Sequence, residues 1–226
     1  MKNQGKSIGR LSLGSEQDIL ICRETVGCLL IKLLEIDHVS KKLSREQWEM
    51  LGWCFLDEDE KVRHSIISSF SMMIQTTGLH IRFLAYSSLT VFDQNGFQLI
   101  KRSLPFALKR IRCTHDDLIG RAMETDDLKL LALVEEVIPE CIVPYVFYLL
   151  SCIPSKNIIL KGKNWDSLEK MAAASLRFLY SALRLSLREG SDNLSYLIQQ
   201  LNLLSKRGIL DHDPEFDSFA TITEVA

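Results

Sequence analysis

The sequence predicts an all-α protein whose helices stack into an elongated array. Apolar residues recur at three- and four-residue steps along most of the chain, and no segment shows the alternation of a half-buried strand. Short turns separate these segments. The chain has 226 residues, of which 46% are hydrophobic and 25% are charged, so it can bury a substantial core.

Capping residues mark where several helices begin. Ser15 with Asp18, and Ser44 with Gln47, have the spacing of a capping box. Gly190 and Gly208 stand where helix C-caps belong. We expect helices at about 16–36, 45–56, 60–77, 79–92, 95–113, 125–137, 139–152, 165–189, 192–207 and 214–226.

An apolar helical run from 138 to 150 contains two prolines and no catalytic group. Pro139 suits a first helical turn, whereas Pro144 is expected to kink a helix that has only just begun. This pattern predicts a helix that packs against other helices of a scaffold protein. The aromatic side chains of Trp48, Phe83 and Tyr145 are expected at seams between helices.

The spacing of acidic and basic residues predicts how the helices stack. Asp57 ends one helix, and Val62 with Arg63 begins the next, which is typical of a HEAT-type repeat. Asp93 follows 36 residues after Asp57. We expect the acid to cap, or to pair across, the turn within a helical hairpin. Such hairpins stack into a solenoid; a compact multi-helix bundle is the alternative.

The chain is interpreted as a flexible N-terminus, 1–14, followed by one HEAT-like repeat segment, 15–226. A solenoid segment has ends that need polar caps, yet both end segments here carry many apolar residues. We therefore expect marginal stability and self-association. The apolar residues concerned are Ile19, Ile21, Val26, Leu29, Leu30, Leu33, Phe216, Phe219 and Ile222.

Composition excludes several functional classes. The net charge of −2 gives no global basic field for nucleic acid. None of the six cysteines forms a C-x-x-C pair, as expected for reduced intracellular thiols. The N-terminus has no apolar core of a signal peptide, and the longest apolar run, 141–150, is half a membrane span.

Motifs for catalysis are weak. The Lys161–Asn164 segment lacks the glycine spacing of a phosphate-binding loop. Cys113 and His115 have no second pair at metal-ligand spacing. The acidic run 57–60 fits a solvated turn at a helix N-terminus. We therefore expect a protein that is not an enzyme and that holds no cofactor or metal.

A basic stripe is the most distinctive local feature. Lys101, Arg102, Lys109 and Arg112 fall within about one quadrant of the helix predicted at 95–113, while its leucines and isoleucines occupy another. The stripe is either a solvated face or a surface for an acidic partner peptide or a phosphate-rich ligand.

Several segments, in this order, resemble the cohesin regulators of the precocious-dissociation-of-sisters, number-five type. They are Leu43-Ser-Arg-Glu-Gln47-Trp48, Asp57, Val62-Arg63, Leu79 to Ala85 with Asp93, Ile138-Pro-Glu140, and Val143-Pro-Tyr145 to Leu150. The resemblance covers roughly residues 40–226, although the chain is much shorter than a typical member. Cys141 stands where the family has tyrosine, His80 where proline is usual, and Arg82 where glutamate is usual.

The resemblance implies a nuclear scaffold without catalytic activity. Such a protein binds the kleisin subunit of cohesin and, with the wings-apart-like releasing factor, modulates the maintenance and release of cohesion. We expect the partner segment to dock beside a set of two aromatic and four basic residues, namely Phe83, Tyr86, Lys101, Arg102, Lys109 and Arg112. A generic HEAT or armadillo-like adaptor in transport or signalling is the alternative function.

Overall fold

The computed structural model describes residues 15–76, 78–125, 138–152, 165–187 and 198. Within these ranges every regular element is a helix, and the predicted all-α class is confirmed. The α-helices are α1 (Glu16–Leu33), α2 (Asp37–Lys42), α3 (Arg45–Cys54), α4 (Glu60–Thr76), α5 (Ile81–Leu84), α6 (Gln94–Thr125), α8 (Ile142–Cys152) and α9 (Trp165–Ser186). Two 3-10 helices are η1 (Ala85–Phe92) and η2 (Pro139–Cys141).

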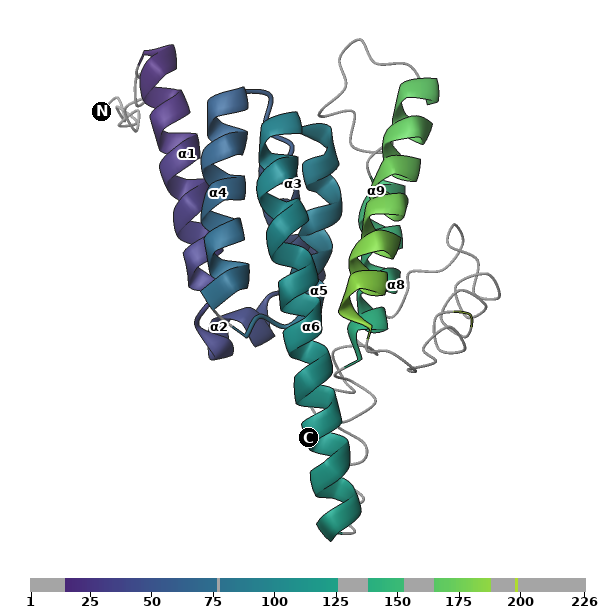
Figure 1. Cartoon of the computed structure of the whole chain (residues 1–226). Helices are drawn as coiled ribbons and strands as arrows, with labels where there is room; N and C mark the ends of the chain where they lie inside the picture. The colour runs from purple at the N-terminus through teal and green to yellow at the C-terminus, as the bar shows by residue number, and fades with distance from the viewer. Residues whose placement is uncertain (1–14, 77, 126–137, 153–164, 188–197, 199–226) are drawn as a thin grey trace, which may run out of the picture.

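The helices form two layers. The helices α1, α4, α6 and α9 lie side by side in that order, and each contacts the next (Figure 1). On the other side lie α3, the α5–η1 segment and α8, and η1 contacts α6, α8 and α9. This stacking in sequence order is the HEAT-like solenoid that the repeat spacing predicted.

The two predicted capping boxes are present. The Ser15 hydroxyl accepts the backbone N–H of Asp18 at 3.3 Å, and the Asp18 carboxylate accepts the Ser15 N–H at 2.8 Å. At the start of α3, the Ser44 hydroxyl accepts the Gln47 N–H at 3.3 Å, and the Gln47 side-chain carbonyl accepts the Ser44 N–H at 2.9 Å. These contacts satisfy backbone donors that the first helical turn leaves without partners.

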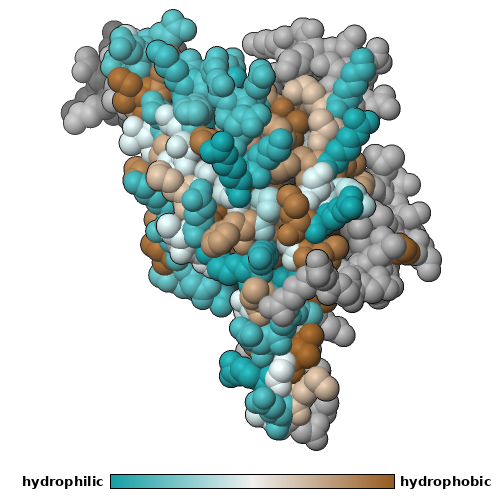
Figure 2. Space-filling model, viewed as in Figure 1, coloured by the Kyte–Doolittle hydropathy of each residue, from teal (hydrophilic) through white to brown (hydrophobic). Residues whose placement is uncertain are grey.

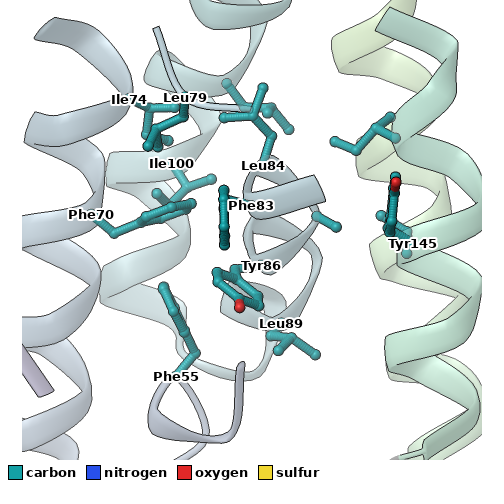
Figure 3. Packing of buried hydrophobic residues seen from close by; sticks show 14 of the residues in the cluster. Phe55, Phe70, Ile74, Leu79, Phe83, Leu84, Tyr86, Leu89, Ile100 and Tyr145 are labelled. Atoms are coloured by element: carbon teal, nitrogen blue, oxygen red, sulfur yellow. The ribbon is translucent and has the colours of Figure 1, made fainter. Parts of the chain in front are cut away.

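The core is centred on α5 and η1. Every residue in 81–90 is buried, because helices cover this segment on both sides. The Tyr86 ring stacks on Trp48 with centroids 5.4 Å apart, and its hydroxyl donates to the Trp48 carbonyl at 2.6 Å. Figure 3 shows Phe55, Phe70 and Phe83 around the same ring, with Tyr145 facing them from α8.

The helix predicted at 79–92 is α-helical only over α5 and continues as the 3-10 helix η1. Side-chain hydroxyls take the carbonyls that an α-helix would use: Ser88 donates to Ala85 O and Thr90 to Ser87 O, both at 2.7 Å. Ser175 of α9 donates to Ser88 O at 2.6 Å. Such local hydrogen bonds compete with the α-helical pattern.

Three other predicted boundaries were wrong. The first helix stops at Leu33 and the short α2 follows it, whereas one helix to residue 36 was expected. The helix expected at 95–113 runs to Thr125 without a break, and Pro105 lies inside it. The α-helix α8 begins at Ile142, so Pro144 occupies its first turn, where a missing N–H costs no intrahelical hydrogen bond. Most of 125–137, and the helices expected at 192–207 and 214–226, lie outside the described residues.

The acids of the repeat pattern cap their own turns, as expected, and they also join neighbouring hairpins. Within its turn, the Asp57 carboxylate accepts the Asp59 N–H at 2.9 Å. Asp57 accepts from Arg23 of α1 at 2.5 Å, and Asp93 accepts from Arg63 of α4 at 3.2 Å. Asp93 also caps α6, because its carboxylate accepts the Gly96 N–H at 2.6 Å. Each acid therefore ties the start of one helix to the helix before it in the row.

The part of the chain that the structure describes contains no helix that combines the length and the apolar character needed to cross a membrane.

Candidate functional site

The outer face of α6 carries an exposed ridge. Arg102, Phe106 and Lys109 follow each other at steps of four and three residues, so they share one side of the helix. All three are exposed, and the Phe106 side chain has a relative exposure of 58%. The opposite side packs into the core through Leu104 and Leu108. Together, Arg102, Phe106 and Lys109 are called the α6 ridge below.

Lys101 of the predicted stripe is exposed beside Arg102. Three of the six predicted partner-binding residues, Lys101, Arg102 and Lys109, therefore lie together on the surface of one helix. In Figure 2 the face formed by α1, α4 and α6 is a mixture of hydrophilic and hydrophobic residues.

Phe83 and Tyr86 do not lie on this surface, and the expectation that they offer apolar area to a partner was wrong. Both side chains have 0% relative exposure. They fill the space between α3, α4 and α5, as Figure 3 shows. Burial raises the pKa of Tyr86 well above its usual value, so its hydroxyl stays protonated and donates to the Trp48 carbonyl. Their role is to hold the layers together.

Arg112 also departs from its expected place on the surface. Its guanidinium donates to the Glu140 carboxylate at 2.6 Å, and the two side chains have relative exposures of 4% and 3%. It donates to the Ser186 hydroxyl as well, at 3.4 Å. The wheel placed Arg112 in the right quadrant, but η2 and α9 cover that edge of α6.

Phe106 is a surface residue that the sequence analysis missed. The signal was its spacing, because it lies four residues after Arg102 and three before Lys109. The wheel drawn for this helix placed only its cations, leucines and isoleucines, so it passed over Phe106. Aromatic and arginine side chains are enriched at protein–protein interfaces, so Phe106 beside Arg102 is a candidate contact for a partner.

The charge of the central repeats differs from that of the whole chain. From residue 61 to residue 115 there are eight lysines and arginines against one acid, a net charge of +7 with histidines neutral, whereas the chain as a whole carries −2. The single acid, Asp93, is buried and paired with Arg63. Six acids flank this window, at 57–60 and 116–117, so a partner would meet the exposed cations of α6 and not the net charge of the segment.

The next helix of the row extends this surface. α9 contacts α6 and carries Arg177, Tyr180 and Arg184, all exposed. Their spacing of three and four residues repeats the basic–aromatic–basic order of the α6 ridge. A second exposed set of the same chemistry thus lies on the helix next to α6.

The family model described as sister chromatid cohesion protein PDS5 matches residues 13–206. The chain belongs to this family. The match spans α1 to α9 and includes the α6 ridge and the second exposed set on α9, and the resemblance seen in the sequence is confirmed. No curated protein and no solved structure gave a significant match. The chain is thus a PDS5-type cohesin regulator built as a HEAT-like scaffold.

Two departures from the PDS5 pattern are absorbed inside the fold. The ring nitrogen of His80 accepts the Arg82 N–H at 3.2 Å and so caps α5. Burial, with the nearby charges of Arg82 and Lys41, lowers the pKa of His80 to about 4, so it is neutral at physiological pH. The Arg82 guanidinium donates to the Ser40 carbonyl and lies 4.8 Å from the Phe83 ring centre. Both side chains thus make their contacts around α5.

Proposed function

We propose that this PDS5-family chain is a nuclear, non-catalytic scaffold that holds the kleisin subunit of cohesin. Through that contact it would take part, with the wings-apart-like releasing factor, in the maintenance and release of cohesion. The observation that carries the proposal is the family match together with an exposed basic ridge that bears an aromatic anchor. The binding role of Lys101, Arg102 and Lys109 stays a prediction.

The chemistry of the α6 ridge selects the kind of peptide it would hold. Arg102 and Lys109 would steer and orient an acidic segment, because charges at the rim of an interface act mainly on association and register. Phe106 would supply the apolar burial that makes such a contact last. An amphipathic kleisin segment with acidic and apolar residues on one side suits both requirements.

Charge reversal on the ridge tests the proposal. We expect Arg102→Glu with Lys109→Glu to weaken binding to a kleisin fragment by at least about tenfold at low salt, which is ~1.4 kcal/mol. The remaining affinity should depend less on salt, because fewer ion contacts are left to screen. Phe106→Ala should weaken binding and keep the salt dependence. Isothermal titration at two salt concentrations measures both effects.

Lys41→Glu with Lys42→Glu on α2 is the matched control. Both lysines are exposed, and the pair changes the net charge by the same amount at a distant place. It should leave affinity within about twofold. If both double variants lose affinity equally, the effect comes from net charge and the ridge is not the site. If the wild-type chain binds no kleisin fragment at low salt, the proposed function is wrong.

A further inference from the structure

Helix α1 is apolar on two opposite sides, and only one of them is covered. Gly27, Ile31 and Leu34 are buried on the side that faces α4. A methyl group at Gly27 would lie 2.5 Å from Ile66 Cδ1, which shows how closely the two helices approach. An amphipathic helix of a globular protein normally has one apolar side, which packs on the core, so a second apolar side needs its own explanation.

The uncovered side has the spacing of a helix-pairing seam. Val26, Leu29 and Leu33 have relative exposures of 53%, 55% and 43%, and Ile19 lies seven residues before Val26. Steps of three and four residues between apolar positions are the pattern with which one helix packs along another. Isolated exposed leucines are common on protein surfaces, but a continuous stripe of this length marks an interface.

The position of α1 in the array explains why its far side is open. α4 and α6 each have a helix of the same row on both sides, whereas α1 is the first member of the row (Figure 1). Hydrophobic residues lie along the molecular edge that α1 forms (Figure 2). The stripe is therefore the side on which another helix would continue the row.

We infer that α1 pairs antiparallel with α1 of a second copy of this chain, about a two-fold axis near Val26. The stripe is self-complementary in that arrangement, because Ile19 and Leu33 are each seven residues from Val26 and both are apolar. A two-fold interface requires this kind of symmetry of the patch. With the axis at Val26, residues 19–33 of the two helices lie alongside each other, which gives a contact about 22 Å long.

The charges at the ends of α1 favour the same orientation. The first turn carries Glu16 and Asp18, and the last turn carries Lys32. An antiparallel copy brings the acidic turn of one helix beside Lys32 of the other. A parallel copy would set acid against acid and lysine against lysine, which is destabilising.

The oligomeric state of the full chain tests the inference. We expect multi-angle light scattering to show a dimer at micromolar concentration, and Val26→Asp with Leu29→Asp to give a monomer with unchanged helical circular dichroism. Leu185→Asp is the matched control, because Leu185 is exposed to 70% on α9 and lies outside the stripe. A wild-type chain that is monomeric at 100 μM, or a double variant that stays dimeric, overturns the inference.

Cys22, which is exposed beside the stripe, reports the orientation. In the antiparallel pair the two Cys22 positions are about eight residues, or ~12 Å, apart along the axis, too far for a disulfide. Val26→Cys in a Cys22→Ser background should cross-link on mild oxidation, and the wild type should not cross-link through Cys22. A Cys22-dependent disulfide would show a parallel pair. A monomer in which Cys22 resists maleimide would show that the chain covers its own stripe; either result overturns the inference.

Discussion

At the scale of single residues, arginines that look alike in the sequence perform different tasks. Arg63 ties α4 to Asp93 and also donates to the Asp57 carbonyl at 2.6 Å. Arg112 is buried against Glu140, while Arg102, ten residues earlier on the same helix, is exposed. What separates them is the neighbour on each side of the helix. The same side chain therefore stabilises the fold at one position and is available to a partner at another.

Truncation of Arg112 should destabilise the protein strongly. Arg112→Ala leaves Glu140 buried without its charge partner, which costs about 3–5 kcal/mol. Replacing both residues, by Arg112→Met with Glu140→Leu, should recover most of that loss, because both charges of this buried pair are then removed. Urea unfolding followed by circular dichroism measures both. Arg102→Ala is the exposed control and should change stability by less than about 0.5 kcal/mol; a loss equal to that of Arg112→Ala would contradict the burial argument.

At the scale of elements, close approach between helices of the row depends on glycine. A methyl group at Gly96 of α6 would lie 2.5 Å from Ile67 Cδ1 of α4 and 3.2 Å from the Asp93 carboxylate. α4 and α6 are also joined by the hydroxyls of Ser71 and Ser103, 2.9 Å apart in the core. Small residues at these points let the helices pack near enough for Asp93 to reach both Arg63 and the start of α6.

Gly96→Ala should therefore destabilise the array, by about 1–3 kcal/mol from overpacking. Ile67→Val removes the atom nearest to the added methyl group. The loss of unfolding free energy in the double variant should therefore be smaller than the sum of the losses in the two single variants. Gly120→Ala on the same helix is the control, since nothing lies within 4 Å of its added methyl group. That change should stabilise the helix by up to about 1 kcal/mol. Strict additivity of the first pair would argue against the contact.

At the scale of the whole molecule, burial is concentrated in the middle of the array. The 81–90 segment is buried at every residue, whereas α1 has an open side. Local stability follows such differences in packing. The middle of the molecule is therefore the part that opens least, and the first helix is the part whose protection depends on what covers it.

Hydrogen exchange should report this difference. Peptides that cover 81–90 should exchange more slowly than peptides from α1 in dilute solution, because every residue in 81–90 is buried. Protection of α1 should increase with protein concentration, while that of the central segment should not change. Mass spectrometry at two concentrations measures both. Equal and concentration-independent exchange in the two segments would contradict this account.

The sequence by itself determined the helical class, both capping boxes, the repeat spacing and the family. These features depend on local chemistry and on short-range order, which a single chain displays directly. It also located the cations of the α6 ridge on one helix. It did not reveal Phe106 as a surface residue, because only the cations, leucines and isoleucines of this helix were placed on the wheel.

Only the tertiary structure decided the rest. It buried Phe83, Tyr86 and Arg112, because helices far away in the sequence cover them. It added a hydroxyl of α9 to the local hydroxyls that take carbonyls of the 3-10 helix at 85–92. It paired Asp57 with Arg23 of α1, the neighbour of α4 in the row. Each outcome depends on a contact between segments that are distant in the chain, and the amphipathic pattern of one helix does not specify its neighbours.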